Sequence, residues 1–492
     1  MSTIADGAPS VGTDIEALYK NFSFGQQFPV ADEEALRAVM REAADELALE
    51  QLMEVLPPLF NLLWRDRSEP IVERYLTRYV DGGLSPFVDL VNAPHDGKRI
   101  VFFTAEINYK LYREALYLKR NGFRVFLVSL VDYGQTMRDS FNAAFDACLA
   151  LPFNLTLLRI LLSRLRPDIL HVHCNMFAYA MARTVIEAKG DALVVCELGD
   201  ITTVYAEPEV LAMVTPMDKV ELDYAMERYL CHHADGLLHQ YSTDVEEELR
   251  DRHGALPQAM QMQPFPCPEF IHYESARHSQ SDGIIRCVFP GNTPPIAPTH
   301  PKEVYPSRTI IDTAETLCAQ GIGVDIVLDP SKPLDATAPN FAAWRELGER
   351  YPHFRIMNGV PPDQISEAIC RHDFGLLHNS IDWSVLRCRR SKMLLQTANK
   401  FFTYLEAGLP ILVDPEFAYM AEMVSEHSIG LVLTKDELRN AAAHIAAFDH
   451  AAAVENIRRY NEQHNMAREI HRLIAFYDRL GNDAAEGLRA AV

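Results

Sequence analysis

The chain lacks paired cysteines, an excess of positive charge and any long apolar run, and each shortage excludes a class of protein. Its nine cysteines stand singly, which is typical of reduced, buried thiols and not of a disulfide framework. Lys and Arg number 46 against 68 Asp and Glu, and the net charge of -22 argues against nucleic acid and anionic membranes as partners. No apolar run reaches the roughly 18 residues of a membrane span, and the first residues do not resemble a signal peptide. We expect a cytoplasmic protein without a transmembrane segment; the oligomeric state stays unknown.

What the chain does contain is the composition of a globular protein of two or three domains. It has 492 residues, of which 48% are hydrophobic and 23% are charged. Residues 1–96 are predicted to form a helical N-terminal extension, because apolar residues recur at helical spacing there. No chemistry is evident in this part, so we expect a helical cap or an oligomer contact.

From residue 98 onward, short apolar runs alternate with helical patterns, which predicts parallel doubly wound sheets. The predicted strands are 98–104, 123–130, 168–173, 192–197, 236–241, 284–290, 323–329, 354–357, 374–378, 409–413 and 430–433. The predicted helices are 110–121, 155–166, 177–189, 307–320, 361–371 and 399–407, and the chain is predicted to be helical from 434 to about 481. A Pro- and His-rich segment at 257–281 is predicted to be a linker. The domains are therefore placed at 97–277 and 278–445, followed by C-terminal helices and a tail at 446–492.

The segment 399–413, Asn-Lys-Phe-Phe-Thr-Tyr-Leu-Glu-Ala-Gly-Leu-Pro-Ile-Leu-Val, carries the most information. It predicts a helix that ends at Gly408, with Pro410 blocking its continuation and a buried strand directly after it. The start of that helix would direct backbone N–H groups and the Lys400 cation toward one spot, which is suited to an anion.

The same segment resembles the nucleotide-sugar-binding segment of GT-B glycosyltransferases. Residues 166–173, Arg-Pro-Asp-Ile-Leu-His-Val-His, and the segments starting at Asn358 and His372 are similar to stretches of the family 4-like members. Over residues 97–480 the resemblance implies the GT-B fold, with two Rossmann-like doubly wound parallel-sheet domains. It also implies transfer of a sugar from a nucleotide diphosphate sugar to a cytoplasmic acceptor, with retention and without a cofactor or bound metal. The base, the sugar and the acceptor stay unknown.

In the C-terminal half, candidate donor-binding residues follow the predicted strands, where ligands bind in such sheets. Lys400 is the candidate for neutralising the diphosphate, and the alternative for the basic residues near it is a solvated loop. The other candidates for this group are Gly291, Asn292, Lys302, Asn379, Ser380, Arg387, Arg389, Arg390 and Lys392. Arg308 is a further candidate with Lys302 for the arginine–lysine pair that the resemblance implies.

The carboxylates that the resemblance implies are missing from their usual places. Thr403 stands where the resemblance implies a ribose-binding carboxylate, and Leu395 stands where it implies a second acid. Glu406 shares a helix face with Thr403 and could hold the ribose instead; the alternative is a plain helix-end carboxylate.

In the N-terminal half, His173 is expected to contact the transferred sugar and Asp200 to bind on the acceptor side. His171 is predicted to be a hydrogen-bonded core residue. The loop after the first strand has no glycine-rich stretch, which leaves Glu106, Asn108 and Lys110 as weaker candidates. No metal site is predicted.

Two other functions fit the same fold. The missing carboxylates and the missing glycine loop are compatible with a GT-B-like binding or scaffold protein that has lost catalysis. A sugar-nucleotide 2-epimerase has the same two-domain architecture and would convert the nucleotide sugar with no acceptor present.

Overall fold

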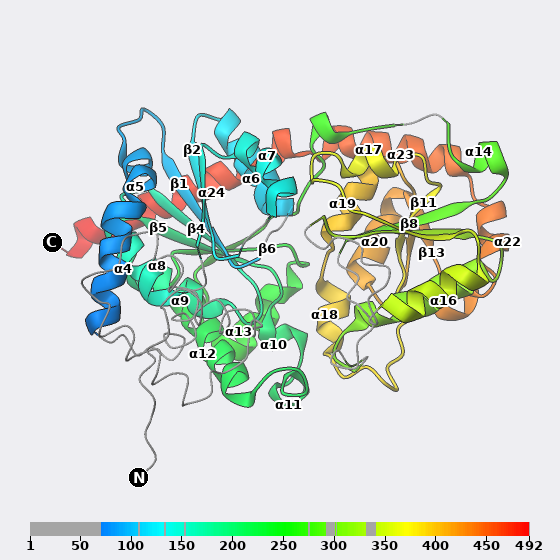
Figure 1. The fold of residues 1–492 in the computed structure, drawn as a ribbon, viewed down its shortest axis with the longest axis horizontal. Coiled ribbons are helices and arrows are strands. Elements are labelled where there is room, and N and C mark those ends of the chain that lie inside the picture. The colour runs from blue at the N-terminus through cyan, green and yellow to red at the C-terminus, as the bar shows by residue number, and fades with distance from the viewer. Residues whose placement is uncertain are drawn as a thin grey trace, which may run out of the picture.

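The structure is a computed structural model that describes residues 70–106, 109–131, 134–151, 154–273, 276–291, 301, 303–330 and 341–491. Two lobes lie side by side, each built on one sheet with helices on both faces (Figure 1). Every strand pair in both sheets is parallel. The predicted fold class, two Rossmann-like parallel-sheet domains, is therefore confirmed.

The sheet of the first lobe has seven strands in the order β3-β2-β1-β4-β5-β6-β7. Its strands are β1 Arg99–Thr104, β2 Arg124–Ser129, β3 Ala147–Ala150, β4 Ile169–Cys174, β5 Leu193–Leu198, β6 Gly236–His239 and β7 Gln258–Gln261. Its helices are α4 Pro70–Gly83, α5 Ser85–Asn92, α6 Tyr109–Arg120, α7 Gly134–Ala144, α8 Leu155–Arg164, α9 Tyr179–Glu187, α10 Thr202–Tyr205, α11 Pro208–Leu211, α12 Met217–His233 and α13 Asp244–His253.

The sheet of the second lobe has six strands in the order β10-β9-β8-β11-β12-β13. Its strands are β8 Arg286–Pro290, β9 Gly323–Val327, β10 Phe354–Met357, β11 Phe374–Leu377, β12 Ile411–Val413 and β13 Gly430–Val432. The remaining elements are η1 Pro268–Phe270, α14 Ser279–Asp282, η2 Pro306–Thr309, α15 Ile310–Cys318, α16 Ala342–Arg350, α17 Ile365–Ile369, α18 Arg390–Leu395, α19 Asn399–Glu406, α20 Ala418–His427, α21 Lys435–Leu438, α22 Ala441–Ala446, α23 His450–Gln463 and α24 Met466–Ala491.

The sequence patterns missed the two outer strands of the first sheet. Strand β7 lies inside the segment 257–281 that was predicted to be a linker, and β3 lies in a stretch to which no strand was assigned. Each has four residues that are only half-buried or exposed. A strand at the edge of a sheet is covered on fewer sides, so it lacks the continuous apolar run that marks a central parallel strand.

The two ends of the described chain both pack on the first lobe. Helices α4 and α5 bury Leu76, Val80 and Val91 in the core on one side of the sheet, whereas residues 1–69 of the predicted N-terminal extension lie outside the described part. Helix α24 leaves the second lobe and crosses back to the first lobe, where it packs against α6 (Figure 1). No helix within the described ranges is long and apolar enough to cross a membrane.

The position of helix α19 is set by close contact with strand β11. The ring of Tyr404 lies directly against Gly375, where an added Cβ would come within 2.2 Å of the ring. The Tyr404 hydroxyl donates to the backbone oxygens of Leu376, at 2.9 Å, and Val288, at 3.1 Å. At the far end of the helix, Gly408 has a φ of 66° and faces Tyr273, so it ends the helix as predicted.

We predict that Gly375→Ala destabilises the protein by about 2 kcal/mol or more, because the new methyl group overlaps the Tyr404 ring and must push α19 away from the sheet. Urea denaturation measures this loss. Gly348→Ala in α16 is the matched control, since its Cβ would lie 3.8 Å from the Phe354 ring, an ordinary van der Waals contact. The control should be neutral or up to about 1 kcal/mol more stable; equal loss in both variants would contradict the prediction.

Candidate functional site

A cavity of about 220 Å³ opens between the lobes, at the carboxyl ends of β1, β8 and β9. Side chains from both domains line it, so its shape depends on how the domains are held together. The location agrees with the rule that open parallel sheets bind ligands beyond the carboxyl ends of their strands. Its lining residues are Glu106, Tyr109, Pro290, Gly291, Asp329, Ile365, Ala398, Asn399, Lys400 and Thr403.

Lys400 supplies the positive charge in this cavity. Its Nζ lies 3.9 Å from the centre of the Phe289 ring, a favourable but weak cation–π contact. Among the described residues, no carboxylate forms an ion pair with it. Burial without such a partner lowers the pKa of Lys400 to about 8. Burial therefore disfavours the charged form of Lys400, and an anion bound beside the ammonium group would offset that cost in free energy.

The backbone around Lys400 is also suited to an anion. Lys400 is the second residue of α19, whose first backbone N–H groups have no partner within the helix. Gly291 follows strand β8 with a φ of 121°, and a Cβ at this position would lie 3.6 Å from Lys400 Cε. A bound group can therefore approach the backbone here. Thr403 and Asn399 complete this wall, so the structure brings together four residues to which the sequence directed attention: Gly291, Asn399, Lys400 and Thr403.

Two carboxylates line the remaining walls. Glu106 follows β1 of the first domain, and Asn175 Nδ2 donates a hydrogen bond to its carboxylate. Asp329 follows β9 of the second domain. Tyr109 lies close to Asp329 across the domain boundary; burial raises the pKa of its phenol, and the Asp329 charge raises it further. Sequence reasoning rated Glu106 weakly and missed Tyr109 and Asp329, although Asp329 ends a predicted strand and could have been found by its position.

Glu406, expected at the ribose, instead joins the two domains in their interior. Its carboxylate accepts hydrogen bonds from Arg113 Nη2 at 2.6 Å, from Arg113 Nε at 3.2 Å and from the backbone N–H of Cys267 at 2.8 Å. Both side chains are almost completely buried, and neither lines the cavity. The expectation that Glu406 binds the ribose is therefore wrong, because these three donors already hold its carboxylate away from the cavity.

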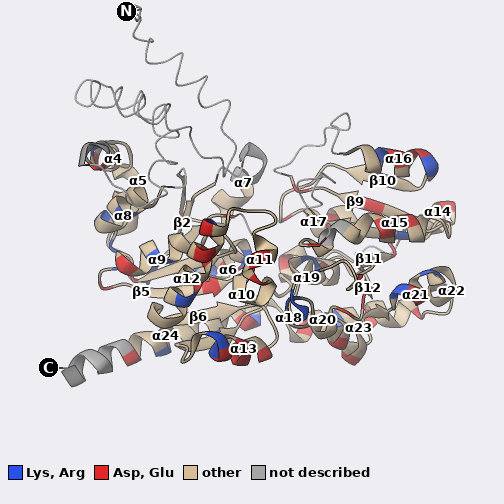
Figure 2. Ribbon diagram, turned by 90° about the horizontal axis from the view of Figure 1, so that it is seen from below, with Lys and Arg blue, Asp and Glu red and all other residues tan. Residues whose placement is uncertain are grey.

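The basic residues before α19 do not line the cavity either, and two of them pair with acids of the first domain. Lys392 is buried and forms an ion pair with Asp200, the residue expected on the acceptor side. Arg389 pairs with Glu207, and the Arg390 guanidinium lies 5.0 Å from the centre of the Trp383 ring. In Figure 2 the blue segments of α18 lie where the two lobes meet.

The side chain of Arg387 is exposed and also lies outside the cavity. The backbone N–H of Arg387 donates a hydrogen bond to the backbone oxygen of Glu303.

The other predicted site residues lie elsewhere or outside the described part. His173 is 1% exposed and does not line the cavity, and burial lowers its pKa to about 4. Asn379 and Ser380 follow β11 and are largely buried away from the cavity; Ser380 Oγ lies 2.7 Å from Thr313 Oγ1. The described residues do not include Asn292, Asn108 or Lys302, and the side chain of Arg308 is not described.

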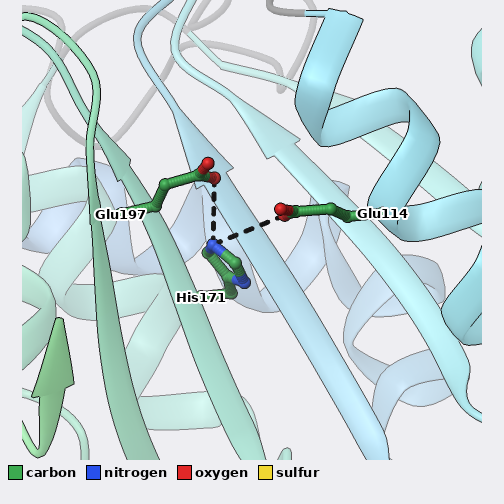
Figure 3. Close-up of side chains that lie close together, drawn as sticks. All are labelled: Glu114, His171 and Glu197. Atoms are coloured by element: carbon green, nitrogen blue, oxygen red, sulfur yellow. Dashed lines mark hydrogen bonds and ion pairs between the residues drawn. The ribbon is translucent and has the colours of Figure 1, made fainter. Parts of the chain in front are cut away.

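A buried polar cluster lies inside the first domain, beneath α6 (Figure 3). Oxygen atoms of Glu114 and Glu197 approach the Nε2 atom of His171 at 3.9 Å and 3.2 Å. His171 also makes a 2.7 Å hydrogen bond to the Tyr477 hydroxyl, which confirms that it is a hydrogen-bonded core residue.

These three side chains lie close enough to share a metal ion, but Lys110 forms ion pairs with both carboxylates. Burial, followed by the nearby Glu197 charge, raises the pKa of Glu114. The Lys110 ammonium group and the raised pKa of Glu114 both oppose the binding of a metal ion here, since metal ligands must be deprotonated.

Residues 331–472, which include α19, match the family described as "Glucosyltransferase 3-like, C-terminal domain". The matched region is smaller than half of the chain. No curated protein has a matching sequence.

Solved structures that resemble this one include a mutant of the Thermobaculum terrenum O-GlcNAc transferase, with 13% identity and a TM-score of 0.48 over 89% of this chain and 81% of that chain. An S. aureus MnaA structure with UDP has 12% identity and a TM-score of 0.48, covering 78% and 97% of the two chains. A glycosyltransferase of avilamycin A biosynthesis has 12% identity and a TM-score of 0.44, covering 78% and 98%. Similarity at this level does not carry an activity over to this chain.

We predict that Glu406→Gln destabilises the protein by about 3 kcal/mol, because it leaves the Arg113 guanidinium buried without its counter-charge. Unfolding of Glu406→Gln, Arg113→Met and the double variant forms a cycle that measures the coupling. The double variant should lose less than the sum of the single variants. Arg439→Ala, which removes an exposed ion pair with Asp436, is the control and should change stability by less than about 0.5 kcal/mol. Additive losses in the cycle would contradict the assignment.

We also predict that Lys400→Met stabilises the free protein at pH 7 by on the order of 1 kcal/mol, because it removes a buried charge. The pKa of Lys400 is about 8 in the folded protein against 10.5 in the reference state, so the unfolded chain binds more protons between these values. The stability of the wild type should therefore rise across this window relative to Lys400→Met, and the difference between them should shrink. Urea denaturation at pH 7 and pH 10 tests this, with Lys435→Met as the exposed control. A pH-independent difference would contradict it.

Proposed function

We propose that the cavity binds a nucleotide diphosphate sugar and that the protein transfers its sugar to an acceptor. The observation that carries this proposal is the ammonium group of Lys400, held at the start of α19 beside Gly291 with no carboxylate paired to it among the described residues. A diphosphate is the kind of anion that a cation and the N-terminus of a helix bind together. The match of residues 331–472 to a glucosyltransferase-like domain supports the same reading.

In this proposal, catalysis depends mainly on stabilising the departing diphosphate. As the bond between the sugar and the diphosphate breaks, negative charge grows on the leaving oxygen, and a fixed cation and N–H groups stabilise that charge more than they stabilise the intact donor. Lys400 and the first N–H groups of α19 would perform this role.

The donor would lie mainly against the second domain, and the acceptor would approach from the first domain, where Glu106 faces the cavity. The Glu106 carboxylate can accept a hydrogen bond from a hydroxyl of the sugar or of the acceptor. Retention of configuration, a cytoplasmic acceptor and independence from a metal or other cofactor are part of the proposal, and the resemblance of segment 399–413 to GT-B donor-binding segments supports them.

Simple assays distinguish the two alternative functions from sugar transfer. An epimerase would convert a nucleotide sugar in the absence of any acceptor, whereas a transferase requires one. A binding protein without catalysis would bind the nucleotide and turn over no donor with any acceptor. The Lys400 cavity favours nucleotide binding in all three cases, so binding is measured first.

We predict that one of UDP, GDP, ADP, TDP and CMP raises the thermal stability of the protein. At about 100 times its dissociation constant, a ligand adds about 2.7 kcal/mol of stability. Lys400→Ala should abolish this shift, whereas Lys435→Ala, a half-exposed lysine paired with Asp382 on the second domain, should keep it. The affinity should fall as pH rises through about 8, because Lys400 then loses its proton. No response to any nucleotide, or an equal response in Lys400→Ala, would refute the proposed donor site.

A further inference from the structure

Glu106, the carboxylate that the first domain contributes to the cavity, is held through both its backbone and its side chain. Its backbone N–H donates to Thr104 Oγ1 at 3.1 Å, and the Thr104 hydroxyl donates to the backbone oxygen of Glu106. Its carboxylate accepts a hydrogen bond from Asn175 Nδ2. Because Thr104 is buried at the end of β1, the backbone of Glu106 is fixed, and the Asn175 amide directs its carboxylate.

Asn175 also contacts the loop that follows β5. Its Oδ1 atom accepts a hydrogen bond from the backbone N–H of Asp200 at 3.2 Å. Gly199 leaves room for this side chain, since a Cβ at Gly199 would lie 1.9 Å from Asn175 Oδ1. The amide therefore uses its donor on one neighbouring loop and its acceptor on the other. In this way Asn175 joins the loops that follow β1, β4 and β5 at the carboxyl edge of the first sheet.

The loop that carries Asn175 contains a strained residue that a buried carboxylate holds. Phe177 has a φ of 70°, which residues other than glycine rarely adopt. Its backbone N–H donates to Asp223 Oδ2 at 2.9 Å, and the same carboxylate accepts a hydrogen bond from the Thr202 hydroxyl at 2.5 Å. Asp223 is a buried residue of α12, so it holds the loops after β4 and β5 in one arrangement. That arrangement fixes the place from which Asn175 reaches Glu106.

The second domain contacts this arrangement through Lys392 of α18. The Lys392 ammonium group forms an ion pair with the Asp200 carboxylate, and it lies 5.1 Å and 5.7 Å from the centres of two tyrosine rings of the first domain. Lys392 thus holds Asp200, and the backbone of Asp200 holds Asn175. Because Asn175 in turn holds Glu106, a shift of the second domain that withdraws Lys392 would weaken the support of the cavity carboxylate.

We propose that Asn175 is a positioning residue for sugar transfer, which directs Glu106 toward the incoming acceptor and makes that direction depend on the docking of Lys392. This inference rests on the proposed function and adds a regulation of the same site by the contact between the domains. The ionised Glu106 carboxylate accepts a stronger hydrogen bond from an acceptor hydroxyl than a protonated one does, so the rate of transfer falls at low pH. The other titratable side chains that line the cavity are Tyr109, Asp329 and Lys400, and Asp200 and Lys392 lie beyond Asn175.

Asn175→Asp tests the contact with Glu106, because it keeps the oxygen that meets Asp200 and replaces the amide donor with a second carboxylate. Release of the nucleoside diphosphate is measured across the pH range with water as the acceptor. The donors are the glucose, galactose and N-acetylglucosamine derivatives of the nucleotide that stabilises the protein. Two adjacent carboxylates resist ionising together, so the fall in rate at low pH should begin about one pH unit or more higher than in the wild type. Glu106→Gln should slow the release and remove this fall.

Asn92→Asp is the matched control for this substitution. The Asn92 amide also joins two groups of the first domain, since it donates to the Arg164 oxygen at 2.8 Å and accepts from the Arg166 N–H at 2.7 Å. These contacts precede β4 and so lie at the opposite edge of the sheet. Asn92→Asp loses a donor in the same way and should keep the wild-type pH profile.

The double variant Glu106→Gln/Asn175→Asp separates support of the loops from the chemistry of the cavity. It restores a hydrogen bond between the two side chains with the donor and the acceptor exchanged. Its thermal stability should therefore return toward that of the wild type, whereas the rate should stay low because the carboxylate is no longer at position 106.

Lys392→Met tests the link to the second domain. It should slow the release by about 2- to 30-fold, the range of a coupling of this kind. It should slow Asn175→Asp much less, because both changes act on the same carboxylate. Arg389→Met removes another ion pair between the domains, the one with Glu207, and should leave the rate and its pH profile unchanged. Nucleotide affinity, measured by calorimetry, should match the wild type in all these variants.

Three results would overturn the inference while leaving the proposed function intact. The first is a fall in rate at low pH that persists in Glu106→Gln. The second is an Asn175→Asp protein with the wild-type pH profile, and the third is a pair of losses in Lys392→Met and Asn175→Asp that simply multiply. A wild-type protein that binds no nucleotide, or that releases none from any of the three donors, would refute the proposed function itself and the inference with it.

Discussion

The buried ion pair between Arg113 and Glu406 is the contact on which the candidate site depends. Arg113 lies on α6 of the first domain and Glu406 ends α19 of the second, so the pair fixes the two helices to each other. One turn before Arg113, Tyr109 lines the cavity, and at the other end of α19 Lys400 does the same. Because a buried pair is strongly directional and costly to break, it sets the distance between the opposite walls of the cavity.

The basic residues near α19 divide into those that join the two domains and one that lines the cavity. The basic residues that precede α19 are occupied at the domain boundary, where Lys392 meets Asp200 and Arg389 meets Glu207. These contacts neutralise acids of the first domain and hold the second domain in place. Lys400 lines the cavity and is paired with no described carboxylate, so it is the one of these cations that a ligand in the cavity can reach.

The sequence was sufficient for the fold because two kinds of local signal are clear in it. Continuous apolar runs mark the central parallel strands, and a glycine marks the end of a helix, as at Gly408. It was also sufficient to place Gly291 and Lys400 at the cavity, because Gly291 follows a predicted strand and Lys400 lies at the start of a predicted helix. It failed for Glu406 and Lys392, since their partners Arg113 and Asp200 lie 293 and 192 residues away in the sequence and only the docking of the domains brings them together. Asp329 was missed although its position after a strand places it at the same edge, because a single acid there belongs to no recognisable motif.

The position of helix α24 affects how the first domain folds during synthesis. Its residues Phe476, Tyr477 and Leu480 are buried, and Tyr477 reaches His171 in the middle of the first sheet. Gly236 in β6 is adjacent to Phe476 and Leu480, where a larger residue would collide with them. The first domain is thus completed by residues that follow the whole second domain in the sequence. Until α24 has been synthesised, the sheet of the first domain exposes an apolar face, and a nascent chain that stops at the domain boundary carries an unfinished core.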